Sequence, residues 1–149
     1  MYRLTNDGLE VYLAHPGGPY FAKKSEGYWG IPKGLLEGAE DERTAAAREF
    51  EEECGFAAPE PHLDLGRITQ RGGKVVHAFA SRWDRDDDPP AVRSNTCPIE
   101  WPPRSGRTID IPEIDGARFF TVDEARRLMN ERQFELVERL QSELNTSSG

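Results

Sequence analysis

The chain has 149 residues and a formal net charge of −8, with 27 acidic against 19 basic side chains. The length predicts one domain, residues 1–149, and the acidic balance disfavours a general grip on nucleic-acid backbone. Two cysteines are too few for a disulfide framework or a zinc site, and no apolar run approaches the roughly 18 residues of a membrane span. We therefore expect a cytoplasmic protein without nucleic-acid or membrane partners.

The first predicted strand covers residues 9–14, where apolar and other side chains alternate. It ends at residues 15–19, because the Pro and Gly residues there cannot continue a ladder. A short apolar segment follows at residues 28–31, and residues 32–34 turn the chain into its most informative stretch.

That stretch contains a predicted helix from near Asp41 to Gly55. Strong helix formers fill residues 45–49, and Gly is favoured just past a helix end. Helical spacing gives the helix a predicted buried face made of Arg43, Ala46, Ala47, Phe50 and Cys54.

Three glutamates, Glu49, Glu52 and Glu53, fall within one neighbouring arc of the same helix. Like charges in one turn repel each other, so the arrangement costs stability unless a cation lies among them. A hard divalent cation, Mg²⁺ or Mn²⁺, suits such an all-oxygen site. The three glutamates therefore predict a metal site on this helix.

Residues 62–70 and 74–83 read as two strands around a Gly-Gly turn, which predicts a hairpin. Residues 84–112 are charged and interrupted by proline, and we expect an irregular connection there. A connection of that length is usually functional or disordered, and the apolar Ile99 and Trp101 favour an ordered, substrate-facing segment.

The remaining chain reads as a short strand at residues 117–120 and two helices. Thr121 with Glu124 forms a capping box that opens the first helix, and the second covers about residues 133–144. Helices interleaved among few strands predict an α/β protein with a mixed sheet between helical layers.

One series of spaced residues carries a family resemblance. Its order is Gly34, five residues, Glu40, seven residues, Arg48-Glu49, apolar Phe50, one residue, Glu52-Glu53, one residue, Gly55 and apolar Phe56. A chance match has a probability on the order of 10⁻⁸ per starting position. This segment resembles the complete Nudix box, and the chain is identified as similar to Nudix hydrolases.

The resemblance implies an α/β/α sandwich with a mixed β-sheet, in which the box forms a loop–helix–loop catalytic motif. It also implies metal-assisted hydrolysis of a nucleoside diphosphate linked to another group. Glu49, Glu52 and Glu53 would hold Mg²⁺ or Mn²⁺ with help from a Gly34 carbonyl, and Glu49 is also a candidate for proton transfer. Arg48 and Glu40 would orient these carboxylates, although an ordinary surface pair of Arg48 with Glu51 or Glu52 is the alternative.

A late acid could reach back to the metals from outside the box. Glu100 is the first candidate, with Glu113 and Asp115 competing for the role, and each is alternatively a surface acid. Trp29 and Trp101 are candidates for stacking on a base, although burial explains a tryptophan equally well. His15, His62 and His77 share no metal or triad spacing.

The segment Trp29-Gly30-Ile31-Pro32-Lys33-Gly34 resembles the pre-box segment of members acting on dinucleoside polyphosphates and diphosphoinositol phosphates. Lys33 would bind phosphate, with Lys23, Lys24 and Arg71 as further cations, and a solvated lysine in a turn is the alternative for Lys33. A Tyr that marks many diadenosine polyphosphate members is missing, because glycines occupy residues 72 and 73.

We therefore expect a small nucleotide or polyphosphate substrate, first a dinucleoside polyphosphate and second an oxidised nucleoside triphosphate. A catalytically silent nucleotide-sensing domain is the alternative from another class. The sequence leaves the oligomeric state open, a dimer included.

Overall fold

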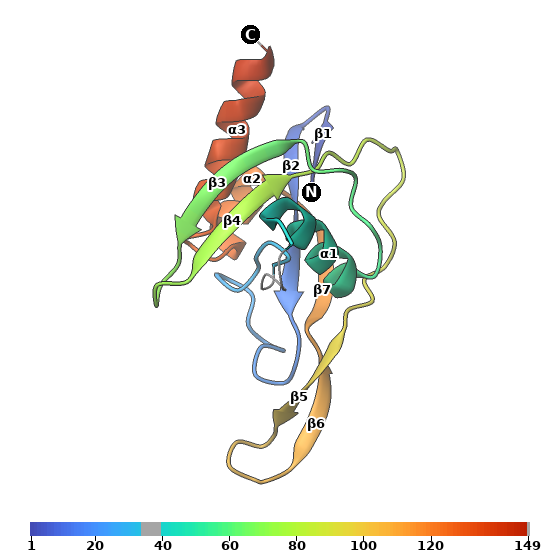
Figure 1. Ribbon diagram of the computed structural model, residues 1–149, viewed down its shortest axis with the longest axis vertical. Coiled ribbons are helices and arrows are strands. Elements are labelled where there is room, and N and C mark those ends of the chain that lie inside the picture. Colours follow the sequence, from blue (N-terminus) through green and yellow to red (C-terminus); the bar gives the residue numbers. More distant parts are fainter. Residues whose placement is uncertain (34–39, 149) are drawn as a thin grey trace.

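The computed structural model describes residues 1–33 and 40–148. Its elements are, in chain order, β1 (Tyr2–Thr5), β2 (Gly8–Pro16), α1 (Glu42–Cys54), β3 (Leu63–Thr69), β4 (Val75–Ala80), β5 (Thr96–Glu100), β6 (Thr108–Pro112), β7 (Ile114–Thr121), α2 (Val122–Leu128) and α3 (Phe134–Ser148). Within these residues, the strands form a three-stranded sheet of order β1-β2-β7, the hairpin β3–β4 and the ribbon β5–β6. Figure 1 shows the ribbon extending away from the body, at the end opposite α3.

The central strand β2 is buried on both faces, because its apolar residues run without interruption. Val11 and Leu13 pack into the core shared with α2 and α3, whereas Tyr12 and Ala14 pack against Phe50 of α1. The sheet is thus covered by α1 on one face and by α2 and α3 on the other. The predicted α/β class is confirmed.

The hairpin β3–β4 lies beside this sandwich rather than inside its ladder. Ile68, Val76 and Ala78 of the hairpin form a smaller core with Leu136 of α3. An isolated parallel bridge between Tyr2 and Arg82 connects the end of the hairpin segment to β1. The hairpin is therefore attached to both α3 and the main sheet.

The predicted bounds of the box helix are confirmed. The Asp41 side chain caps its N-terminus by accepting the Thr44 N–H at 2.9 Å, and Gly55 ends it with φ +83°. A Cβ at Gly55 would lie 2.6 Å from the Arg93 carbonyl oxygen, so this position requires glycine for space as well as for conformation.

The predicted buried face of this helix was partly wrong. Phe50 and Cys54 are buried as expected, but Arg43 and Ala47 are exposed. Ala45 and Glu53 are buried in their place. The buried face differs from the predicted one because the chain before the box packs against the side of the helix that carries Glu53. There the Lys33 backbone N–H donates a hydrogen bond to the Glu53 carboxylate.

The expectation of an irregular segment over residues 84–112 was also wrong, since β5 and β6 lie inside it. Cys97 pairs with Ile111 and Ile99 with Ile109, so one face of the ribbon is apolar. Pro98 argued against a strand because it lacks an N–H, but each ribbon strand has a single partner and tolerates it.

The C-terminal predictions hold. The capping box at Thr121 and Glu124 is present in both directions, and α3 spans the last predicted helix. None of the described helices has the length and apolar character needed to cross a bilayer.

Candidate active site

Arg48 joins three of the box glutamates. Its Nη2 lies 2.6 Å from Glu40 Oε1, and its Nε lies 3.2 Å from both Glu40 oxygens. Its Nη1 lies 3.0 Å from Glu49 Oε1 and 3.1 Å from Glu52 Oε2. A forked guanidinium can hold several carboxylates in fixed directions. Arg48 therefore has more contacts than the single surface pair that was the alternative.

Glu53 faces the other way, toward the segment before the box. Its Oε2 accepts a hydrogen bond from the Lys33 backbone N–H at 3.1 Å, and the residue is 8% exposed. Burial raises the pKa of Glu53 to about 7, against the hydrogen bond from Lys33, and the charges of Glu113 and Glu49 act in the same direction as burial. Burial also raises the pKa of Glu49, against the attraction of Arg48. Two box carboxylates are therefore held where their charge is costly.

Glu113 is the late acid that the structure brings to this helix. Its backbone N–H donates to the Asn95 carbonyl at 2.8 Å, and its carbonyl accepts the Gly17 N–H at 3.0 Å. The Asn95 N–H in turn donates to the Glu52 carbonyl of α1 at 3.1 Å. These bonds anchor Glu113 beside the helix, and its charge contributes to the raised pKa values of both Glu49 and Glu53.

The other two late acids are occupied elsewhere. Asp115 contacts Nδ1 of the buried His15 at 2.8 Å. Glu100 lies at the end of β5, where Oε1 accepts the Arg104 N–H at 2.7 Å, on the ribbon that Figure 1 shows extending away from α1. The structure thus does not bring Glu100 to the box glutamates. The sequence ranked Glu100 first, because a ribbon was not expected there.

The donor set fits a hard divalent cation by its chemistry. Burial of Glu53 next to other carboxylates is unfavourable unless a cation or a proton compensates it, and carboxylate oxygens are ligands that such cations prefer. Within residues 1–33 and 40–148, no three His, Cys, Asp or Glu side chains converge closely enough to hold a metal ion. Gly34, the predicted carbonyl ligand, lies outside the described residues.

A cavity of about 650 Å³ adjoins Glu49 and lies among α1, β2, the hairpin β3–β4 and α3. Its walls include apolar side chains such as Ile31, Val76 and Leu136, and Glu49 and Lys33 line it too. Among the described lining residues there is no Asn or Asp. The cavity therefore offers apolar walls and charged groups, without an amide for reading a base edge.

Two lysines line the same cavity. Burial lowers the pKa of Lys33, and repulsion by Lys74 lowers it further, against attraction by Glu53. Lys74 immediately precedes β4, at the end of the hairpin turn. Sequence reasoning missed it as a candidate cation because that turn was used only to predict a hairpin. Of the other predicted cations, Lys23, Lys24 and Arg71 do not line the cavity, and Lys24 Nζ lies 4.0 Å from the Tyr20 ring centre.

The two candidate stacking tryptophans lie apart from this cavity. The Trp29 ring packs 4.8 Å from Phe120 and 5.1 Å from His15, measured between ring centres. Trp101 follows β5 on the ribbon, and its backbone N–H donates to the Arg107 carbonyl at 2.9 Å. The aromatic residues that do line the cavity are Tyr2, Tyr12, Phe50 and Phe79.

The family model of the NUDIX domain matches residues 1–140 of the chain. The chain therefore belongs to the Nudix family, and it is a Nudix hydrolase acting on pyrophosphate bonds. Members of this family generally use divalent metal cations. No curated protein sequence matches the chain.

Solved structures share the fold at low sequence identity. A C. elegans Ap4A hydrolase binary complex is 19% identical with a TM-score of 0.69, over 97% of this chain and 94% of that chain. The NUDIX domain of Shewanella oneidensis NrtR complexed with ADP ribose is 14% identical with a TM-score of 0.62, over 96% and 82%. The E. coli ORF135 protein is 17% identical with a TM-score of 0.56, over 95% and 84%.

Proposed function

We propose that this chain is a Mg²⁺- or Mn²⁺-dependent diphosphohydrolase whose preferred substrate is a nucleoside carrying three or more phosphates. A dinucleoside polyphosphate ranks ahead of an oxidised nucleoside triphosphate. The observation that carries the proposal is the buried Glu53, which accepts the Lys33 backbone N–H and feels the charges of Glu113 and Glu49. Lys33 and Glu49 in turn line a cavity of about 650 Å³.

Each box residue has a proposed role that agrees with its contacts. Glu49, Glu52 and Glu53 hold the cation, and Arg48 with Glu40 keeps the carboxylates of Glu49 and Glu52 in place. When bound, the cation neutralises phosphate charge and lowers the pKa of the attacking water.

Proton removal from water needs a carboxylate within hydrogen-bond reach of the attacking water. We assign this role to Glu113, which also replaces Glu100 as the late acid expected to reach back to the metals, because its charge acts on Glu49 and Glu53 whereas Glu100 lies on the ribbon. Glu49 remains the alternative base within the box.

The cations on the cavity support a long phosphate chain. Lys33 and Lys74 repel each other across the same cavity, and an anion between them would relieve that repulsion. A chain of several phosphates offers more charge to meet two lysines than a single diphosphate does. The apolar walls would then cover a nucleoside. The described lining residues include no Asn or Asp, which disfavours recognition of one particular base.

The fold neighbours agree with a nucleotide as substrate. One is described as an Ap4A hydrolase and another as complexed with ADP ribose. Ap4A and ADP ribose are both small nucleotides. A silent sensing domain is disfavoured because the box retains its full set of glutamates, which binding alone does not require.

The experiment is a comparison of kcat/KM for diadenosine tetraphosphate and 8-oxo-dGTP at equal Mg²⁺. We expect diadenosine tetraphosphate to be preferred. A tenfold preference for 8-oxo-dGTP, about 1.4 kcal/mol in the transition state, would reverse the ranking. No product from a broad panel of nucleoside diphosphate derivatives with Mg²⁺ or Mn²⁺ would instead favour the sensing domain.

A further inference from the structure

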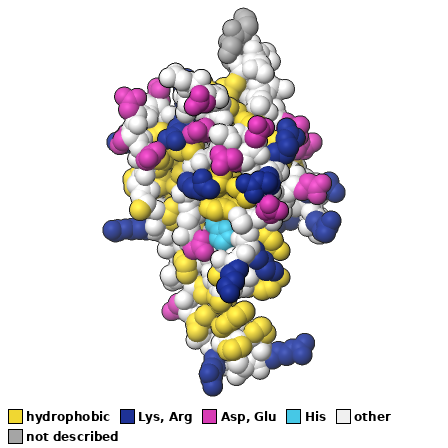
Figure 2. Space-filling view, turned by 180° about the vertical axis from the view of Figure 1, so that it is seen from behind, with side chains coloured by type: hydrophobic (Ala, Val, Ile, Leu, Met, Phe, Trp, Pro, Cys, Tyr) yellow, Lys and Arg dark blue, Asp and Glu magenta, His cyan; other side chains and the backbone are white. Residues whose placement is uncertain are grey.

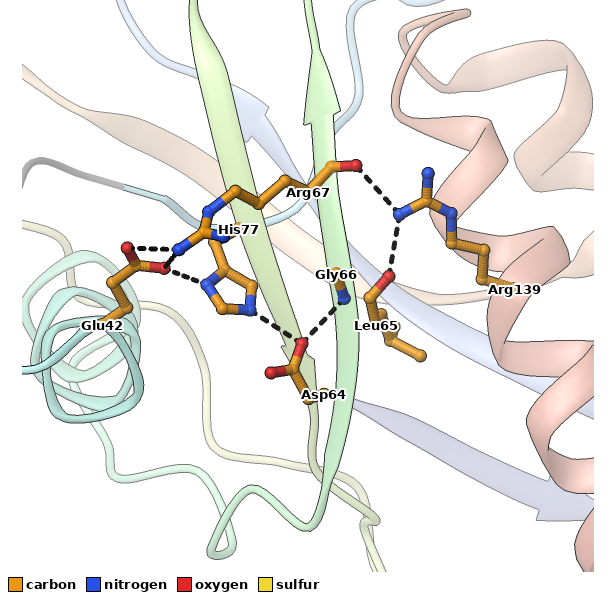
Figure 3. Close-up of polar contacts among 7 residues, drawn as sticks. All are labelled: Glu42, Asp64, Leu65, Gly66, Arg67, His77 and Arg139. Atoms are coloured by element: carbon orange, nitrogen blue, oxygen red, sulfur yellow. Dashed lines mark hydrogen bonds and ion pairs between the residues drawn. The ribbon is translucent and has the colours of Figure 1, made fainter.

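His77 lies between two carboxylates that come from different elements. Its Nδ1 contacts Glu42 in the first turn of α1, and its Nε2 lies 2.7 Å from Asp64 Oδ1 on β3. Figure 3 shows the ring placed between these two side chains, with the hairpin β3–β4 between α1 and α3. The ring is mostly buried, with 17% of its side chain exposed.

This arrangement specifies the protonation state of the ring. A neutral imidazole carries one N–H, so one of its nitrogens would direct a lone pair at a carboxylate. The imidazolium carries two N–H groups and can donate to Glu42 and Asp64 together. Hydrogen bonds lower the pKa of both Glu42 and Asp64, so both are carboxylates near neutral pH, and only the protonated ring satisfies both of them.

Other charged groups around the ring support the same contact between helix and hairpin. Arg67 Nη2 lies 2.8 and 3.0 Å from the two Glu42 oxygens, and so adds a second cation to that carboxylate. From α3, Arg139 donates to the carbonyls of Leu65 and Arg67 at 2.9 Å each. The remaining charged groups near the ring or at the same cavity wall are Arg43, whose guanidinium lies over Phe79, and Lys74.

The contact between His77 and Glu42 lies at the wall of the cavity, so it affects how that wall is held. Glu42, Arg67 and His77 all line it, and the hairpin forms one of its walls. In the described part of the chain the hairpin joins the main sheet through the Tyr2–Arg82 bridge at one end and shares no continuous ladder with it. Polar contacts to α1 and α3, together with apolar packing, therefore help to hold the rest of the hairpin in place.

We propose that His77 is a proton-dependent clasp that fastens the hairpin β3–β4 to helix α1 and thereby closes the cavity wall. When His77 loses its proton, one of its two carboxylate contacts becomes repulsive, and the hairpin separates more readily from the helix. The Arg67–Glu42 pair persists, so the clasp loosens without unfolding the domain.

The direction of the pKa agrees with this clasp. Burial disfavours the charged ring, but the hydrogen bonds to Glu42 and Asp64 outweigh it and raise the pKa of His77 above 6.5. The clasp is therefore complete below pH 6.5 and is lost as pH rises through the folded-state pKa.

The test combines ¹⁵N NMR of the histidine rings with amide hydrogen exchange of β4 on the metal-free full chain. We expect both His77 nitrogens to be protonated at pH 6. The opening equilibrium constant, corrected for intrinsic exchange, should rise with pH above 6.5, by at most about tenfold per pH unit, until the ring is neutral. His77→Gln should remove that dependence. His62→Gln should keep it, because the His62 ring contacts the Tyr2 hydroxyl and, among the residues that the structure describes, no carboxylate.

Asp64→Asn provides a second variant if His77→Gln does not fold. It removes one carboxylate at a half-exposed position and should shift the pH dependence of β4 amide exchange to lower pH. A His77 ring that is neutral at pH 6, or β4 exchange with the same pH dependence in His77→Gln, would overturn the clasp. Neither readout needs turnover, so they stand apart from a failure of the proposed hydrolase activity.

Discussion

Glu53 accepts the backbone N–H of Lys33 across 3.1 Å, twenty residues away in sequence, while remaining 8% exposed. This bond fixes the segment before the box to the helix that carries the glutamates. It also keeps a carboxylate in a place where burial raises its pKa to about 7. The ionised Glu53 carboxylate therefore lowers the stability of the folded protein, and a bound cation would offset that cost.

Glu53→Gln should stabilise the metal-free protein at pH 8. Because the folded-state pKa is raised, the folded protein binds more protons than the unfolded chain between pH 4.5 and 7, and its stability falls as pH rises through that window. Removing the charge should recover up to on the order of 3 kcal/mol above pH 7 and nothing near pH 4. Urea unfolding in a chelator measures this, with Glu51→Gln, an exposed helix position, as control. A Glu53→Gln protein less stable than wild type at pH 8 would contradict it.

Arg48→Lys should lower both stability and turnover although it keeps the charge. A lysine ammonium cannot place separate N–H groups on Glu40, Glu49 and Glu52 as the fork does. We expect a loss of about 1–2 kcal/mol in unfolding free energy, with a larger relative loss in kcat. Arg85→Lys, in an exposed pair with Asp87, is the control and should change neither quantity. Equal behaviour of the two variants would show that the guanidinium fork is not needed.

Glu113→Gln and Glu100→Gln separate the two late acids. Glu113→Gln should reduce kcat by about 10²-fold or more, because it removes a carboxylate next to Glu49 and Glu53. Glu100→Gln should leave kcat unchanged, since its carboxylate caps the Arg104 N–H on the ribbon. Steady-state kinetics at saturating Mg²⁺ decides between them. A larger loss of kcat in Glu100→Gln than in Glu113→Gln would assign the late-acid role to Glu100.

Gly55→Ala should destabilise the protein by more than Gly72→Ala. Both positions have positive φ, +83° and +90°, so both substitutions strain the backbone by about 1 kcal/mol. Only at residue 55 would the new Cβ also lie 2.6 Å from a backbone oxygen, whereas nothing lies within 4 Å at residue 72. Melting temperatures of the two variants measure the difference. Equal losses would mean that the chain around Arg93 moves aside freely.

The box helix could be predicted almost to the residue, because its signals are local. Asp41 as cap, strong helix formers and Gly55 as terminator do not depend on what packs against the helix. The buried face could not be fixed in the same way. Whether Ala47 or Glu53 turns inward depends on the chain before the box, which is distant in sequence.

The late acid and the cavity depended on long-range contacts that no local pattern reveals. Glu113 reaches the helix through backbone bonds with Gly17 and Asn95, and these join three separate segments. Pro98 concealed a ribbon whose cross-strand apolar pairs are visible only once its register is known. Lys74 gains its position on the cavity from the fold of the hairpin, and its neighbours in sequence indicate only a turn.

The most direct test of the central claim is kcat/KM for diadenosine tetraphosphate in wild type and Glu53→Gln, with Mg²⁺ and with a chelator. The account predicts turnover in wild type with Mg²⁺ alone. It also predicts a decrease of about 10³-fold or more in Glu53→Gln, since several kcal/mol of transition-state stabilisation depend on the cation. Wild-type-like rates in Glu53→Gln at saturating Mg²⁺, or equal wild-type rates in the chelator, would contradict it.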